Sequence, residues 1–88
     1  MMKFILDERG KLIINVEQVQ AVYIHEDSDM DEHGNFVANG VFFVKCLLSG
    51  REDSIHLMTF DGDDREKNFS AAKVYLAELF DKLNGGNS

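Results

Sequence analysis

The chain has 88 residues, of which 16 are acidic and 9 are basic, so its formal net charge is −7. Such a charge repels phosphate backbones, and we therefore expect no direct binding of nucleic acids and no attraction to anionic membrane surfaces. With 44% hydrophobic residues, the chain is too apolar for a disordered segment. The length predicts one domain, which we place at residues 1–84, followed by a tail at residues 85–88.

Cys46 is the only cysteine in the sequence, which excludes an internal disulfide and a zinc site built on cysteines. We interpret it as a small buried side chain within a strand rather than as a nucleophile. The apolar run at the start of the chain is too short for a signal peptide, and no stretch reaches the length of a membrane span. These features predict a cytoplasmic protein that needs no cofactor.

The first quarter of the chain predicts short strands. Apolar runs at residues 3–7 and 11–15 flank a turn that contains Gly10, and this pattern predicts a β-hairpin. Residues 15–18 begin with Asn and predict a helical corner of about one turn. Residues 19–26 alternate and are rich in β-branched and aromatic side chains, which indicates a further strand.

The middle of the chain combines the most polar and the most apolar segments. Residues 27–35 are the most polar stretch of the chain and predict a solvated loop. Asn39 and Gly40 predict a two-residue hairpin turn, because both central residues of that turn need positive φ. This turn is expected to join a stub of strand to the long apolar strand at residues 40–49, and residues 54–60 predict the last strand.

The strand at residues 40–49 is apolar on both faces, which is typical of a strand that is covered on both sides. One helix covers only one face of a small sheet. Either the sheet curls into a partial barrel, or a second subunit covers the other face. We therefore take the apolar residues of the odd-numbered face as the candidate interface: Val41, Phe43 and Leu47.

The C-terminal segment predicts an amphipathic helix. Asp63 is the expected N-cap, with Glu66 completing a pattern that resembles a capping box. Gly85 and Gly86 are expected to end the helix. Apolar residues recur at spacings of three and four and form one stripe, made of Phe69, Ala72, Leu76, Leu79, Phe80 and Leu83.

These elements predict an α+β fold in which an antiparallel meander of about five strands is packed by one C-terminal helix. A partial barrel and an arrangement like that of pleckstrin-homology domains are the alternatives. The layout resembles small uncharacterised bacterial proteins built from a β-meander and a final helix. Residues 12–19, 44–50 and 57–60, leading into 72–83, carry this likeness. The resemblance implies a bacterial or phage-like origin and the fold, but no activity and no functional residues.

The acidic loop is a candidate metal site. Asp27, Asp29 and Asp31 stand at alternate positions, and their pattern resembles the start of an EF-hand calcium loop. The pattern then departs from that loop, because its sixth position is Glu32 and its twelfth is Ala38. A solvated loop that keeps the protein soluble explains the same residues. Calcium binding is therefore the alternative function.

Motifs for catalysis are missing from the sequence. The histidines at positions 25, 33 and 56 do not show the spacing of metal ligands, and no nucleophile elbow or phosphate-binding glycine loop occurs. We therefore expect no enzyme. The leading hypothesis is a non-catalytic protein-interaction module, a homodimer or partner-bound protein that associates through the apolar sheet face.

Overall fold

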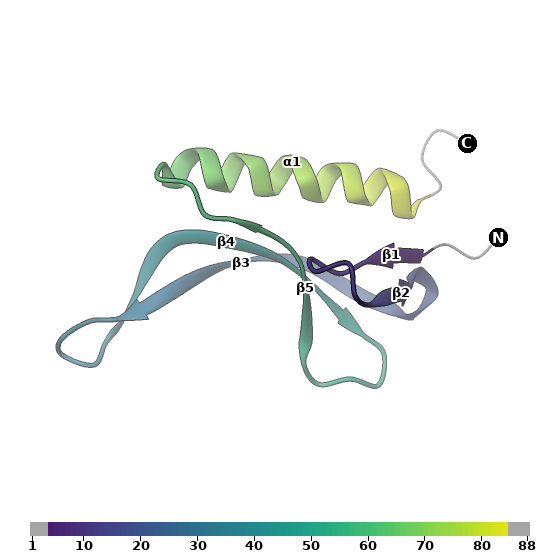
Figure 1. The fold of residues 1–88 in the computed structure, drawn as a ribbon, viewed down its shortest axis with the longest axis horizontal. Coiled ribbons are helices and arrows are strands. Elements are labelled where there is room, and N and C mark those ends of the chain that lie inside the picture. Colours follow the sequence, from purple (N-terminus) through teal and green to yellow (C-terminus); the bar gives the residue numbers. More distant parts are fainter. Residues whose placement is uncertain (1–3, 85–88) are drawn as a thin grey trace.

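The computed structural model describes residues 4–84, and it shows an α+β fold with five strands, as the sequence predicts (Figure 1). The strands form two antiparallel sheets rather than one continuous meander. The first sheet pairs β1 (Phe4–Leu6) with β2 (Ile13–Asn15). The second has the order β3 (Val19–Met30), β4 (Phe36–Leu48) and β5 (Ser54–Phe60). A short 3-10 helix, η1 (Val16–Gln18), joins the sheets, and α1 (Arg65–Leu83) follows β5.

The β1–β2 hairpin is confirmed, and its turn shows why it forms. The carboxylate of Asp7 accepts hydrogen bonds from the backbone N–H groups of Lys11 and Leu12 at 2.8 and 3.0 Å. Gly10 adopts a φ of 68°, which is accessible to glycine at little cost. The hairpin turns Ile14 toward the core, where only 1% of its surface is exposed. The predicted corner is also confirmed, since η1 begins directly after Asn15.

The polar segment that follows differs from the predicted loop. β3 continues to Met30, and only residues 31–35 form the turn. Asp31 organises this turn by accepting hydrogen bonds from the N–H groups of His33 and Asn35. The loop prediction was wrong for residues 27–30 because the ladder to β4 pairs their backbone, while the side chains of Ser28, Asp29 and Met30 stay exposed.

Asn39 and Gly40 lie inside β4 and not in a hairpin turn, so that prediction was also wrong. The register runs from the pair Glu26–Phe42 to the pair Ser28–Ala38, and β4 therefore places residues 39–41 opposite a single residue of β3. This is a β-bulge, and Gly40 has the positive φ, 80°, that the sequence indicated. The prediction of a positive φ was right, but in the structure this φ belongs to a bulge within a strand and not to a hairpin turn.

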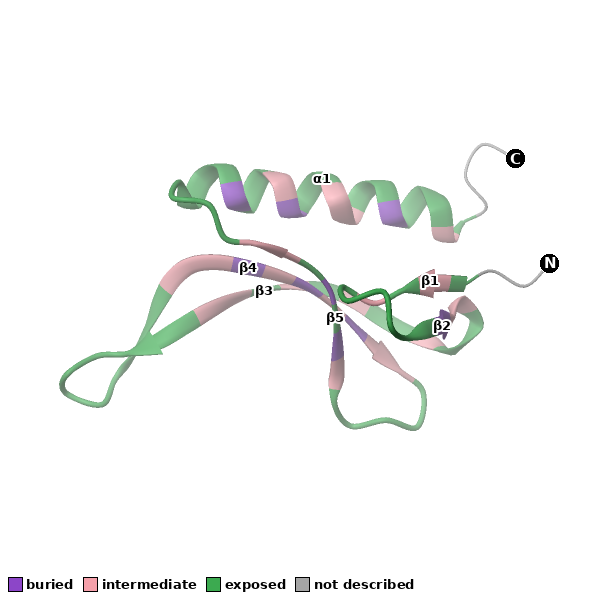
Figure 2. Cartoon of the chain, viewed as in Figure 1, coloured by how far each residue is buried: buried purple, intermediate pink, exposed green. Residues whose placement is uncertain are grey.

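The core lies between the three-stranded sheet and α1, with the β1–β2 hairpin contributing at one end (Figure 2). Cys46 is fully buried there, as predicted, and burial raises the pKa of its thiol. No closed barrel forms among residues 4–84, because β3 and β5 remain the edges of their sheet. The buried apolar residues are Ile14, Phe42, Val44, Cys46, Ile55, Leu57, Ala72 and Leu79.

The N-cap of α1 is Asp64 rather than the predicted Asp63. The Oδ1 atom of Asp64 accepts hydrogen bonds from the N–H groups of Glu66 and Lys67 at 2.9 and 3.2 Å, which satisfies two donors that the helix leaves unpaired. The helix ends at Leu83, with Asn84 as its C-cap. The predicted stop at residues 85 and 86 lies outside the described part of the chain. None of the helical structure within residues 4–84 is long and apolar enough to cross a membrane.

The predicted apolar stripe of α1 is confirmed except at its margins. Ala72 and Leu79 are buried, and Leu76 and Leu83 pack against the core. Phe80, however, exposes 64% of its surface, so its assignment to the core was wrong. Phe80 lies instead on the flank of α1 that borders an open groove beside the first residues of β3.

Candidate functional site

The candidate site is the face of the three-stranded sheet that points away from α1, here called the open face. Phe43 lies near its centre on β4, the middle strand. Side chains alternate along a strand, so the neighbours of buried Phe42 and Val44 must point to this opposite side. Cross-strand partners share a face, and the register therefore gathers Ala21, Tyr23, His25, Phe43, Lys45, Leu47, Ser54, His56 and Thr59.

Contacts across β4 and β5 hold the centre of the open face in place. The rings of Phe43 and His56 are stacked, with centroids 4.7 Å apart and planes 20° from parallel. The Lys45 ammonium lies 5.6 Å from the centroid of the Phe43 ring, within the range of a cation–π interaction. An aromatic ring held by two such contacts offers a fixed apolar contact surface at little entropic cost.

The candidate interface residues all lie at this face. Phe43 and Leu47 are half-buried by their neighbours, and Val41 lies half-buried in the bulge beside them. Tyr23 and His56 also belong to this surface, although the sequence pattern did not indicate them. Their place depends on the pairing of each with Lys45, and the register that sets this pairing is interrupted by irregularities, two in β3–β4 and one in β4–β5.

Solvent reaches the open face in the described structure. Tyr23 exposes 38% of its surface, and His25 and His56 are also exposed. The opposite face of the same sheet is filled by α1 and the core residues. The sheet therefore has one dry side and one wet side, although its middle strand is apolar on both.

The three aspartates of the metal hypothesis are spread along the end of β3. Asp27 accepts a hydrogen bond from the Asn39 side-chain amide at 3.0 Å, which lowers the pKa of its carboxyl group. Asp29 is exposed in the strand, and Asp31 holds the turn. The Cα atoms of alternate residues in a strand are about 7 Å apart. Oxygens that bind one calcium ion each lie within about 2.6 Å of it, and hence within about 5 Å of one another.

No group of three or more His, Cys, Asp or Glu side chains among residues 4–84 is arranged to hold a metal ion. The three histidines are also spread out, with one on β3, one in the turn and one on β5. Calcium binding through Asp27, Asp29 and Asp31 stays a prediction of the sequence that no arrangement in the described residues favours.

A polar junction fixes the bulge of β4 against the start of α1. Arg65 donates from Nε and Nη2 to the two carboxylate oxygens of Glu26, both at 2.9 Å. The Gly40 N–H donates to the same carboxylate at 3.1 Å. The hydrogen bond from Arg65 is the main reason that the pKa of Glu26 lies below its usual value. This junction sets where β4 bends, and hence where the open face ends.

Comparisons with protein-family models, with curated proteins and with solved structures give no significant match. The chemistry of the surfaces themselves is what bears on function. Two surfaces are unusual for a small acidic domain: the open face, and an apolar groove beside α1.

Proposed function

We propose that the protein is a non-catalytic protein-interaction module that forms a homodimer through the open face. The observation that supports this is the position of Phe43. It is held by His56 at the centre of a sheet face that the described residues leave uncovered, on a strand whose other face is fully packed. Uncovered apolar surface of this kind marks association sites, and a two-fold dimer is the commonest solution.

The charge distribution favours this face for contact between two copies. Each chain carries a net charge of −7, so most approaches of one copy to another are repulsive. The central rows of the open face instead carry Lys45, His25 and His56, with Asp27 at the margin. Two acidic molecules therefore meet with less repulsion here than through an acidic surface, and two such faces stack with about 10 Å between the sheets. A cytoplasmic setting and a bacterial origin remain part of this proposal.

The test is the oligomeric state by sedimentation equilibrium at micromolar concentration. We expect the native chain to dimerise and Phe43→Thr to weaken the dimer at least about tenfold, as truncation of a central aromatic contact does. Threonine keeps the β-propensity of the position. The matched control is Ile13→Thr, an apolar strand residue that is 66% exposed on the β1–β2 hairpin, in the separate two-stranded sheet. It should dimerise like the native chain.

A monomer at all accessible concentrations removes the proposal, and so does an equal loss in the control variant. If Phe43→Thr fails to fold, as judged by circular dichroism, His56→Ala replaces it. His56 is exposed, so its removal leaves the core intact while it takes away the ring that supports Phe43. A dimer that His56→Ala does not weaken contradicts the proposal equally.

A further inference from the structure

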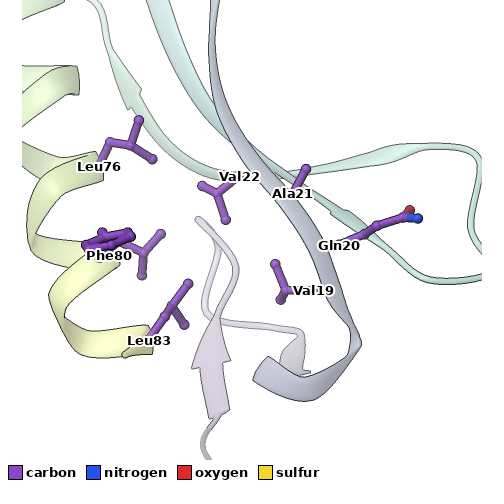
Figure 3. A pocket seen from close by; sticks show the side chains of 8 residues that line it. Val19, Gln20, Ala21, Val22, Leu76, Phe80 and Leu83 are labelled. Atoms are coloured by element: carbon purple, nitrogen blue, oxygen red, sulfur yellow. The ribbon is translucent and has the colours of Figure 1, made fainter. Parts of the chain in front are cut away.

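A groove of about 340 Å³ runs between α1 and the first residues of β3 (Figure 3). In that figure Leu76, Phe80 and Leu83 point from the helix toward Val19 and Val22 of the strand. Every lining side chain except one glutamine is apolar. The full lining is Val19, Gln20, Ala21, Val22, Leu76, Leu79, Phe80 and Leu83.

The strand side of the groove is a sheet edge. β3 is the end strand of its sheet, and within residues 4–84 only β4 pairs with it. Residues 19–22 line the groove consecutively, although successive side chains of a strand point to opposite faces. The groove therefore meets β3 along its backbone as well as its side chains. An edge backbone presents N–H and C=O groups that another extended chain can pair with.

The helix side of the groove supplies an apolar wall. Phe80 is 64% exposed, although it belongs to the apolar stripe of α1. Leu76 and Leu83 lie closer to the sheet and pack against the core. A chain added beside β3 would direct alternate side chains into the space between strand and helix. Main-chain hydrogen bonds then give affinity and the groove selects apolar side chains, as in other cases of strand addition.

The charge along the same edge identifies the occupant. Beyond the groove, β3 continues past Glu26, which is already paired with Arg65, through Asp27 and Asp29 to a turn that carries Asp31 and Glu32. β3 contains no Lys or Arg, so a second copy that paired through its own β3 would bring no lysine or arginine to these carboxylates. Basic side chains on an incoming strand would complement them, and like charges opposite one another would repel.

We propose that the β3 edge and its groove bind an extended segment of another protein as an added strand. The segment has apolar residues over the groove and Lys or Arg beside the acidic end of β3. This site shares neither Phe43 nor His56 with the homodimer, and it goes beyond the proposed function. Addition in the antiparallel sense, which pairs slightly more strongly, places the basic residues in the N-terminal half of the segment.

The test is a titration followed by amide resonances in NMR spectra of the full chain. The probe is a blocked ten-residue peptide in which lysine and serine alternate over the first half and valine and threonine over the second. We expect shifts confined to residues 19–29 and the facing side of α1, with slower hydrogen exchange along β3 on binding. A second peptide with glutamate in place of lysine should bind at least about tenfold more weakly.

Two matched pairs of variants locate the site. Phe80→Asp should weaken binding at least about tenfold, whereas Val74→Asp makes the same change of charge on the same helix, at a residue that is 57% exposed and outside the groove, and should bind normally. Asp29→Asn should weaken binding about twofold and reduce its salt dependence. Glu52→Gln, in the turn before β5, removes the same charge elsewhere and should have no effect.

Equal binding of the two peptides overturns the proposal, as do equal losses in Phe80→Asp and Val74→Asp. Self-association that Phe80→Asp abolishes would assign the groove to a second copy and also overturn it. Phe43→Thr separates the two proposals, because it should break the homodimer and still bind the peptide. Loss of the dimer with peptide binding intact is the result that both proposals predict. A dimer that persists in Phe43→Thr would contradict the homodimer, and a folded Phe43→Thr that no longer binds the peptide would contradict the separate site.

Discussion

At the scale of single residues, Asn68 joins two separate segments of the main chain through its side-chain amide. It is the one buried polar residue among those described, with 7% of its surface exposed. Its Oδ1 accepts from the Gly62 N–H at 3.0 Å, and its Nδ2 donates to the carbonyls of Gly40 and Gly62 at 2.9 and 2.8 Å. One side chain in α1 thus holds both the loop after β5 and the bulge of β4.

Replacement of Asn68 by alanine leaves one N–H and two carbonyl groups of the main chain without their partner. These hydrogen bonds are partly buried, and a polar group that loses its partner there is costly, so we expect Asn68→Ala to lower the free energy of unfolding by about 2 kcal/mol in urea denaturation. Asn84→Ala is the matched control, since its amide makes an exposed hydrogen bond to Phe80 at the other end of α1. It should cost less than about 1 kcal/mol, and equal losses would contradict this role of Asn68.

At the scale of elements, the bulge of β4 is fitted to the start of α1. A Cβ atom on Gly40 would stand 3.4 Å from the Cβ of Arg65, which is ordinary contact with no room beyond it. Gly34, in the β3–β4 turn, has nearly the same φ, 81° against 80°, but no atom within 4 Å of such a Cβ. The two glycines therefore separate the cost of backbone strain from the cost of crowding.

We expect Gly34→Val to lower the free energy of unfolding by about 1–2 kcal/mol, the cost of a left-handed residue with a side chain. Gly40→Val should cost at least about 1 kcal/mol more, because its methyl groups also displace Arg65. Chemical denaturation of the two variants measures the difference. Equal losses would show that the bulge does not face the helix as described.

The same elements show how far local sequence predicts this molecule. The β1–β2 hairpin, the corner at residues 16–18 and the helix were predictable, because turn residues and periodicity specify them locally. The extent of β3 was not predictable, since Ser28 belongs to the strand only through its pairing with Ala38 on β4. Gly40 carried a correct signal for positive φ, yet a turn and a bulge need the same backbone there.

The candidate surfaces were predictable only in part for the same reason. The alternation of β4 placed Phe43 and Leu47 together on one face, as expected. Tyr23 and His56 join them through pairings that bulges shift, and a pattern within one segment contains no information about those. The groove depends on how far the sheet extends beneath α1, which the helix sequence does not contain. Phe80 was therefore assigned to the core, although it forms one wall of the groove.

At the scale of the whole molecule, acid should reveal which carboxylates stabilise the fold. The pKa values of four carboxyl groups lie below normal: Asp7 through the Leu12 N–H, Glu26 through Arg65, Asp27 through Asn39, and Asp53 through Arg51. A folded pKa below the unfolded one means that the unfolded state binds the proton more readily. The stabilisation is therefore present above about pH 4 and is lost as pH falls through the folded pKa values.

Glu26 provides the cleanest measurement, because its carboxylate joins β3, the bulge and α1. Protonation also relieves the general repulsion of a chain with a net charge of −7, so the melting temperature of the native protein alone mixes two opposing effects. The difference between native protein and Glu26→Gln largely cancels the general term. We expect the native protein to be the more stable above about pH 5, and the difference to shrink toward zero between about pH 4 and pH 2.

Thermal unfolding of both proteins across this pH range makes the comparison, with Glu52→Gln controlling for the loss of one exposed negative charge. The control should stay close to the native protein at every pH, because a single exposed charge without a fixed partner contributes little. If the difference for Glu26→Gln persists unchanged at pH 2, Glu26 stabilises the protein through its shape and not its charge. The bulge would then be held by Asn68 and by packing, and Arg65 would not fix the position at which β4 bends.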